Sequence, residues 1–215
     1  MCYFFSLAEE EIRLQKRYNS QFEIPGKFKG EKLINGFTFP DVPILTNEFP
    51  NLFRFFKWGF IPNWTKSKNE ALAIRKMTLN ARLETIFDKP SFSSSAKYYR
   101  CLIPVNGFYE WQHEGSKKVK HYIKLIDHKI FSLGGLWSEW VDKETGEIYQ
   151  TFSVVTMPAN PIMEKIHNTK KRMPVILPSE IEFEWLKRDA NQSYLFELAN
   201  YCSEDRLWAS PYDND

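Results

Sequence analysis

Runs of aromatic and β-branched residues, separated by polar clusters and by Gly or Pro, recur along most of the chain. Short apolar runs of this kind are typical of β-strands. The predicted strands are Arg54–Ile61, Tyr98–Val105, Gly107–Gln112, Tyr122–Ile126, Ile130–Trp137, Tyr149–Thr156 and Met173–Leu177. Two polar segments between these strands, Asp127-His128 and Lys143–Glu147, are predicted to be hairpin loops.

Three segments show helical patterns instead. Residues Leu7–Tyr18 place glutamates in a first turn and basic residues in a last turn, which complements a helix dipole. Ser179 and Glu182 have the spacing of a capping box that opens a helix ending at Lys187, and a further helix is predicted over Gln192–Asn200. No repeat or low-complexity linker divides the chain. We therefore expect one α+β domain over residues 1–215, with an antiparallel β core and helices at its two ends.

Charge and composition narrow the function classes. The 215 residues include 29 Lys+Arg and 27 Asp+Glu, a net charge of +2, so any nucleic-acid site must be a local patch rather than a basic domain. Aromatic residues make up 16% of the chain, and 7 Trp are more than a core of this size usually needs. No apolar stretch approaches the length of a membrane-spanning helix. We expect a soluble, cytoplasmic protein.

Cysteine usage is that of a reducing compartment. Cys2, Cys101 and Cys202 are odd in number and far apart, and they lack a C-x-x-C pair or a neighbouring His at metal-ligand spacing. The sequence therefore predicts neither a disulfide framework nor a metal site, and no cofactor motif is present.

Cys2 has a special chemical position. Aminopeptidases remove Met1 when the second residue is small, which would leave a cysteine with a free α-amine and a thiol on adjacent carbons. This 1,2-aminothiol condenses with an aldehyde to an imine, and the thiol then closes a thiazolidine ring. An α-amine has a pKa of about 7.7–8.0, so roughly a tenth of it is nucleophilic at pH 7. The alternative, favoured by position alone, is a retained Met1 or a small buried cysteine.

Two further segments combine groups suited to catalysis. Asn80 and Arg82 are two residues apart, so on an extended segment they project to one face, where an amide and a guanidinium can hold a polar or phosphorylated substrate. Glu110 is a lone acid in an apolar run, and burial would raise its pKa toward neutrality. A turn with a salt bridge and an exposed strand glutamate are the respective alternatives.

The densest basic cluster, Lys165–Pro174, contains His167. A phosphate-binding loop with an acid/base histidine is one interpretation, and a solvated basic loop is the other. The remaining histidines, at 113, 121 and 128, are predicted to lie at the surface. Trp64 and Trp111 are the tryptophans most suited to a binding role. Aromatic rings beside basic residues are typical of single-stranded nucleic-acid binding, although core packing is the more common role of a tryptophan.

The ordered set of these motifs resembles the SRAP proteins, which are SOS-response-associated peptidases also called abasic-site processing proteins. The matching segments are Met1-Cys2, Trp58–Pro62 with Trp64, Asn80–Thr85, Cys101–Trp111, Gly135–Trp137, Thr156 with Ala159-Asn160, and Ile166-His167 followed by Arg172–Pro174. Together they span residues 2 to about 178. The resemblance implies an SRAP-like fold with a barrel-like β core.

The resemblance also implies a function. Family members bind single-stranded DNA at abasic sites and crosslink to the ring-opened aldehyde through the N-terminal cysteine, which shields the lesion. They are also credited with lyase or crosslink-reversal chemistry and with removing their own leading residue. By resemblance, Cys2 would be the nucleophile, Asn80 would orient the amine, Glu110 would move protons, and His167 would assist opening of the sugar.

DNA-binding residues follow in the same way. Arg82 would hold a phosphate, Trp64 and Trp111 would hold flanking bases, and Pro40 is the one residue carried over from a segment that otherwise departs from the family. The basic loop after His167 is two residues longer than the common form, so Lys170, Lys171 and Arg172 all stay candidates for the phosphate contact. The usual Gly-Arg after the cysteine is replaced by Tyr3-Phe4, which removes one phosphate contact.

We therefore expect a monomeric abasic-site sensor with single-stranded DNA as its partner, cytoplasmic and associated with the nucleoid during repair, and with no membrane, metal or cofactor requirement. An N-terminal-nucleophile cysteine peptidase acting on protein substrates is one alternative. A non-catalytic single-stranded DNA binder, in which Cys2 is incidental, is the other.

Overall fold

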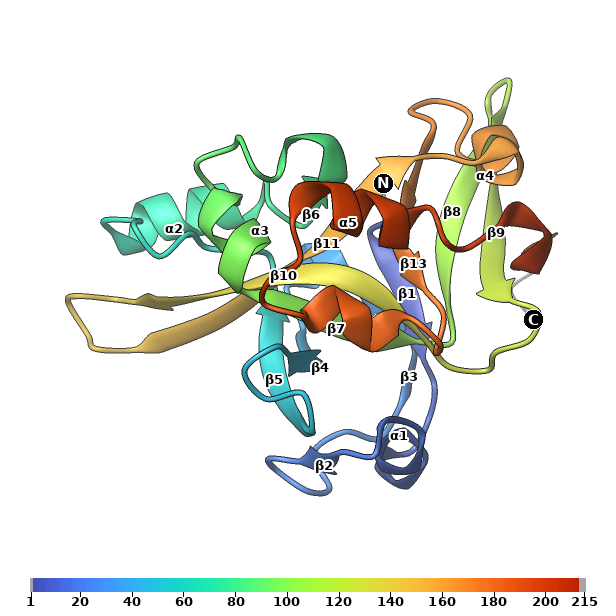
Figure 1. The fold of residues 1–215 in the computed structure, drawn as a ribbon. Coiled ribbons are helices and arrows are strands. Elements are labelled where there is room, and N and C mark those ends of the chain that lie inside the picture. The colour runs from blue at the N-terminus through green and yellow to red at the C-terminus, as the bar shows by residue number, and fades with distance from the viewer. Residues whose placement is uncertain (1, 213–215) are drawn as a thin grey trace.

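A closed ring of five strands forms the centre of the computed structural model, which describes residues 2–212. The strands are β5 (Leu52–Trp58), β4 (Asp41–Thr46), β7 (Arg100–Val105), β10 (Phe131–Val141) and β11 (Ile148–Pro158). Successive neighbours pair antiparallel, and β11 returns to β5 through a short parallel pairing. The α+β fold with a barrel-like core is therefore confirmed, and Figure 1 shows helices around it.

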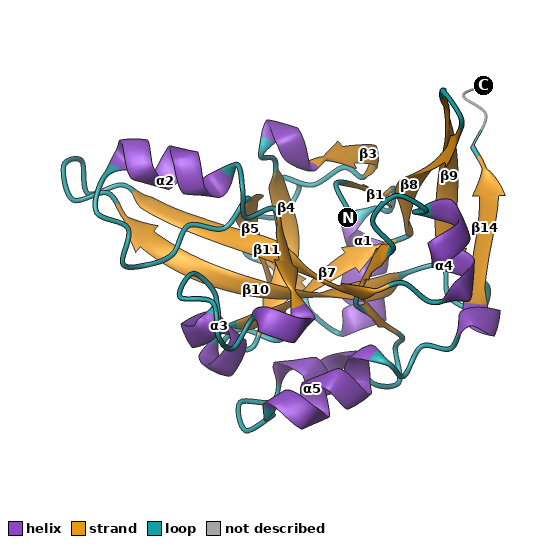
Figure 2. Ribbon diagram, turned by 90° about the horizontal axis from the view of Figure 1, so that it is seen from above, coloured by secondary structure: helices purple, strands orange, loops and turns teal. Residues whose placement is uncertain are grey.

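A second sheet lies at one end of this barrel. Its strands, in spatial order, are β14 (Leu207–Pro211), β9 (Lys117–Leu125), β8 (Gly107–Glu114), β1 (Phe4–Leu7) and β3 (Glu31–Asn35). Figure 2 shows β1, β8, β9 and β14 side by side. Because β1 pairs with β8 on one edge and with β3 on the other, the chain immediately after Cys2 is fixed on both sides.

Helices and short strands cover the outside of the two sheets. The helices are α1 (Glu11–Tyr18), α2 (Lys68–Arg75), α3 (Ser93–Tyr98), α4 (Pro161–Ile166) and α5 (Gln192–Ala199), with 3-10 turns η1 (Gly36–Thr38), η2 (Leu83–Thr85), η3 (Glu182–Leu186) and η4 (Glu204–Arg206). The short strands are β2 (Gln21–Phe22), β6 (Asn80–Arg82), β12 (Arg172–Pro174) and β13 (Ile176–Leu177). None of the helices within residues 2–212 is long and apolar enough to span a membrane.

One buried cluster joins the barrel to the second sheet. Phe5 of β1 packs on Trp58 of β5, with ring centroids 4.8 Å apart, and Trp58 in turn stacks on Phe152 of β11. All three side chains are completely buried. Because an aromatic side chain buries a large apolar area, these contacts hold β1 firmly against the barrel.

Several predicted elements need correction. The helix predicted over Leu7–Tyr18 begins only at Glu11, because Leu7 is the last residue of strand β1 and residues 8–10 connect the two elements. The capping box predicted at Ser179 does not form, since the Glu182 carboxylate is buried and binds Arg17 and Ser132 instead, and a 3-10 turn follows.

The two predicted hairpin loops differ in outcome. Lys143–Glu147 does connect the paired strands β10 and β11, which extend from the barrel toward α2 (Figure 1). The prediction at Asp127-His128 is wrong, because β9 and β10 lie in different sheets and the connection passes between them. The edge of β9 is instead covered by β14, and Arg206, just before β14, binds Asp127 with N and O 2.8 Å apart.

Candidate active site

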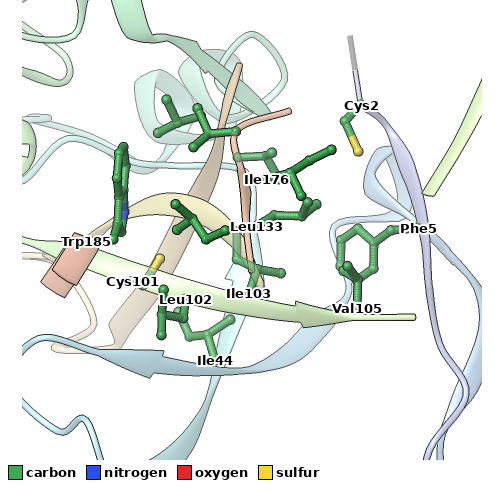
Figure 3. Packing of buried hydrophobic residues seen from close by; sticks show 14 of the residues in the cluster. Cys2, Phe5, Ile44, Cys101, Leu102, Ile103, Val105, Leu133, Ile176 and Trp185 are labelled. Carbon is green, nitrogen blue, oxygen red and sulfur yellow. The ribbon is translucent and has the colours of Figure 1, made fainter. Parts of the chain in front are cut away.

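Cys2 lies just before β1, at the margin of the buried cluster. Figure 3 shows its sulfur directed toward that cluster, and its side chain is 0% exposed. Burial, and then the nearby negative charge of Glu110, raise the pKa of the Cys2 thiol far above its usual value. The thiol is therefore neutral at physiological pH, and its proton must pass to another group when the sulfur forms a bond.

Glu110 comes from the middle of β8 and faces inward. Both faces of β8 are covered here, since Phe108 and Tyr109 are buried as well, and strand alternation places Phe108 on the same face as Glu110. The side chain is 4% exposed, and burial raises the pKa of Glu110 from 4.5 to about 7. The expectation of a carboxyl with a raised pKa is confirmed, and the exposed-strand alternative is excluded.

His167 ends helix α4 and lies opposite Glu110. Its Nδ1 is 2.8 Å from the Arg172 carbonyl oxygen and 3.2 Å from the Arg172 backbone nitrogen, so the backbone of Arg172 holds this edge of the ring and Nε2 is directed toward the site. Nε2 lies 3.9 Å from Oε2 of Glu110. Burial lowers the pKa of His167 below 6.5, which keeps the ring neutral at pH 7. A neutral base thus faces a titratable acid.

Glu110 and His167 both line a small cavity of about 150 Å³. It is lined by Tyr3, Glu110, Trp111, His113, His167, Thr169 and Lys170. The predicted residues Glu110, Trp111, His167 and Lys170 are brought together here, whereas Tyr3, His113 and Thr169 were not predicted as site residues. Within residues 2–212, no cluster of three His, Cys, Asp or Glu side chains is arranged to hold a metal ion.

Asn168 fixes the basic loop to β8. Its side-chain amide accepts from the His113 backbone N–H at 3.1 Å and donates to the His113 carbonyl at 2.8 Å. This pair of bonds resembles one step of a β-ladder and holds the loop after His167 over the cavity.

The surface location predicted for His121 is wrong. This residue is 7% exposed and lies directly opposite Glu110 in the β8–β9 register.

Asn80 and Arg82 lie on β6, which pairs in parallel with β11. Neither residue lines the small cavity. Both polar atoms of the Asn80 amide are buried, and neither has a hydrogen-bond partner among residues 2–212. Because an unsatisfied buried amide is costly, this arrangement is typical of a group that binds a ligand. The Arg82 side chain is exposed.

The three basic candidates after His167 have different environments. Arg172 is buried, makes a two-pronged ion pair with Glu84, and donates to the Thr156 carbonyl oxygen at 2.7 Å. Lys171 is exposed beside Glu164, and Lys170 lines the cavity. Lys170 is therefore better placed than Arg172 for a phosphate contact. Arg172 instead stabilises the loop after His167.

The other predicted DNA-binding residues are dispersed. Trp111 lines the small cavity, but Trp64 lies at a separate cavity of about 250 Å³, together with Phe60, Tyr99 and Trp137. Trp64 is 48% exposed and donates from Nε1 to the Pro90 carbonyl at 3.2 Å. Pro40 precedes β4, accepts from the Trp58 backbone N–H, and lines neither cavity.

Comparison with known proteins identifies the family of the chain. A profile of the family described as SOS response associated peptidase (SRAP) matches residues 1–214. The chain belongs to the SRAP family. Among curated SRAP relatives, the abasic site processing protein YoqW of Bacillus subtilis is 34% identical over 220 residues, covering 100% of this chain and 89% of YoqW. Abasic site processing protein YobE of the same organism is 33% identical over 203 residues, covering 92% and 88%.

Solved structures show the same SRAP fold. A crystal structure of a protein from Bacteroides thetaiotaomicron matches with a TM-score of 0.94 and 38% identity, covering 100% of this chain and 93% of that chain. A protein from Bordetella bronchiseptica has a TM-score of 0.83 at 23% identity, which shows likeness of fold alone.

Proposed function

We propose that this SRAP protein processes abasic sites in single-stranded DNA, and that Cys2, once Met1 has been removed, captures the ring-opened aldehyde as a thiazolidine. The observation that carries the proposal is that Glu110 and His167 face each other at a small cavity also lined by Tyr3, while Glu110 is close enough to Cys2 for its charge to raise the pKa of the thiol. Cys2 itself is buried directly before Tyr3. Met1 itself lies outside the described residues. The relatives named above as abasic site processing proteins support the same substrate class.

The proposed reaction balances without an oxidant or cofactor. The α-amine of Cys2 adds to the aldehyde carbon, and the resulting hydroxyl leaves as water to give an imine. The thiol sulfur then bonds to the imine carbon, its proton is removed, and the former imine nitrogen takes up a proton. One C–N bond and one C–S bond replace the C=O bond, and one water is released.

Glu110 is suited to both proton transfers. With a pKa of about 7 it is present in both forms at neutral pH, so the acid can protonate the departing hydroxyl and the carboxylate can then accept the thiol proton. Because burial and the Glu110 charge keep the Cys2 thiol protonated, a nearby acceptor is required at that step.

His167 acts on the sugar in this proposal. In the tautomer that donates from Nδ1 to the Arg172 carbonyl oxygen, the neutral ring has its lone pair on Nε2, which can take the proton of the C1′ hydroxyl as the deoxyribose ring opens. The bond from Nδ1 to the Arg172 carbonyl fixes the ring, and Arg172 is itself held by Glu84. Crosslink reversal would use the same groups in the opposite direction, with water adding back to the imine. Lyase chemistry would instead branch from the imine, where a base removes a C2′ proton and the 3′ phosphate leaves.

Substrate binding is assigned to residues around this centre. We propose that the unsatisfied Asn80 amide orients the N-terminal amine, that Arg82 and Lys170 contact phosphates, and that Trp111 stacks on a base. Stacking of a base on an aromatic ring contributes about 1–3 kcal/mol. Lys171, Pro40 and Trp64 would contact DNA farther along the strand, and Arg172 would contribute through the loop.

A crosslinking assay tests the proposal. Protein whose N-terminus is verified by intact mass spectrometry to begin at Cys2 is incubated with a 5′-labelled single strand that bears one abasic site. We expect a heat-stable, slowly migrating band from the wild type and none from Cys2→Ala, whose free amine still gives an imine that borohydride traps. No band from verified wild-type protein would refute the proposal.

The same experiment separates the alternatives. Cleavage of unrelated peptides by the wild type, lost in Cys2→Ala, would favour an N-terminal-nucleophile peptidase. Non-covalent DNA binding of equal strength in both proteins, with no band in either, would favour a non-catalytic binder. Cys101→Ala is the matched control, because Cys101 is completely buried in the barrel and should have no influence on the band.

A further inference from the structure

Four aromatic side chains form a continuous cluster that includes Tyr3 and Trp111 of the cavity lining. Tyr3 and Phe37 have ring centroids 4.7 Å apart, Phe4 and Phe37 6.0 Å, and Phe4 and Trp111 4.9 Å. We call these four residues the aromatic platform. Phe37 is 53% exposed, so about half of this apolar residue remains in contact with solvent.

Backbone contacts hold the platform in place before any ligand arrives. The Gly36 N–H donates to the Tyr3 carbonyl oxygen at 2.9 Å, which joins the η1 turn to the segment that carries Cys2. Within this turn the Asn35 side chain accepts from the Phe37 N–H at 3.0 Å, and the Thr38 hydroxyl donates to the Asn35 carbonyl at 2.8 Å. A ligand that stacks on Phe37 therefore pays little conformational entropy.

We propose that the aromatic platform is a stacking subsite for the nucleobase next to the abasic site, with Phe37 as its exposed face. This inference rests on the proposed function and adds a binding determinant to it. The platform is continuous with the reaction centre, because Tyr3 and Trp111 belong to both the platform and the cavity lining, and Tyr3 directly follows Cys2.

The chemistry of the lesion fits such a subsite. A base beside an abasic site has lost its stacking partner on one side, so an aromatic ring can cover the vacant face without breaking a base–base contact. Lys170 at the cavity supplies a cation for the backbone, while the platform itself has no charged member. Every base has a π-face, and a larger ring system gains more from stacking, so we expect tolerance of sequence with a preference for purines.

Binding to a strand that cannot react tests the subsite separately from the crosslink. Fluorescence anisotropy is measured with a labelled single strand in which tetrahydrofuran replaces the abasic sugar, and the nucleotide on each side is in turn a purine, a pyrimidine or a second tetrahydrofuran. We expect the wild type to bind most tightly with a purine on one particular side. Phe37→Ala should weaken binding about 5- to 150-fold and remove this dependence.

Further variants distinguish stacking from general apolar contact. Phe37→Trp should retain the affinity and the purine preference, whereas Phe37→Leu should lose most of both. Phe183→Ala is the matched control, because Phe183 is 41% exposed on η3 and belongs neither to the platform nor to the cavity. Loss of an uncharged ring should leave the slope of log affinity against log salt unchanged, while Lys170→Ala should reduce it by about one.

The outcomes are separable from those of the crosslinking assay. Wild-type affinity and base dependence in Phe37→Ala would overturn the platform, even if Cys2 crosslinks as proposed. The wild type could instead bind the strand without forming a crosslink, while Phe37→Ala binds it more weakly. This result would support the platform and refute the thiazolidine. An equal effect of Phe183→Ala would overturn the platform as well.

Discussion

Replacing Glu110 by glutamine is expected to stabilise the fold and to slow the chemistry at the same time. The carboxyl is almost completely buried beside Cys2 and His167, and its pKa is raised from 4.5 to about 7. At pH 7 about half of the molecules hold the acid form, whereas an unperturbed glutamate would do so in about 1 of 300. Burial therefore enlarges the population of the proton donor by about 150-fold.

The same shift has a cost in stability. Between pH 4.5 and about 7 the folded chain keeps a proton that the unfolded chain has lost, so the free energy of unfolding falls as pH rises through this window. A shift of this size corresponds to about 3 kcal/mol, complete above pH 7 and absent below pH 4.5. Glutamine has nearly the shape of the protonated acid and carries no charge, so Glu110→Gln should recover much of this amount.

Urea unfolding at pH 5 and pH 8, together with the crosslinking rate, checks both effects. We expect Glu110→Gln to be up to about 3 kcal/mol more stable than wild type at pH 8 and nearly equal at pH 5, with crosslinking slowed by about 10²- to 10⁴-fold. Glu114→Gln, an exposed position on the same strand, is the control. A destabilised variant, or a stability difference that does not change with pH, would refute the reasoning.

Three other substitutions test separate parts of the molecule. His167→Ala should slow crosslinking about 10²- to 10⁴-fold with partial rescue by added imidazole, and an unrescued variant with wild-type binding would contradict a proton-transfer role. Burial opposes the ionisation of Glu84, but the bonds with Arg172 outweigh it and lower its pKa, so Glu84→Gln should cost about 1–3 kcal/mol in urea unfolding at pH 7. That difference should shrink as pH falls below about 4.5, because the wild type then loses its own ion pair, and a constant difference would contradict it. Gly107→Ala should lower stability by about 1–3 kcal/mol in thermal melts, because its Cβ would lie 2.5 Å from the Ile123 carbonyl oxygen; unchanged melting would show that β9 can move aside.

The local pattern of apolar residues predicts those strands in which consecutive positions are all apolar. The barrel strands around Cys101 and Phe152 were found in this way, because they are buried on both faces and stand out as apolar runs. Strand β14 was missed, since its pairing with β9 depends on a partner some 80 residues earlier in the chain. Strand β1 is not predicted for the same reason, and its last residue, Leu7, falls in the predicted helix: nothing local shows that Phe4 and Phe5 pair on both edges.

Some residues of the candidate site could likewise be predicted from the sequence, and others could not. Glu110 and His167 could be singled out because a lone acid in an apolar run and a histidine in a basic cluster are visible in the sequence. Asn168 could not, because its importance comes from two bonds to the backbone of His113, which lies 55 residues away. Phe37 likewise resembles any exposed aromatic residue until the η1 turn places it against Tyr3.

The pairing of β1 on both edges has a mechanical consequence. A DNA strand joined to Cys2 would transmit tension to the end of a strand that lies between β8 and β3. A motor moving along that DNA would have to shear two rows of backbone hydrogen bonds before the chain could extend, since no slack tail separates the attachment point from the sheet. The protein would thus resist being pulled off by force more strongly than one tethered through a terminal linker.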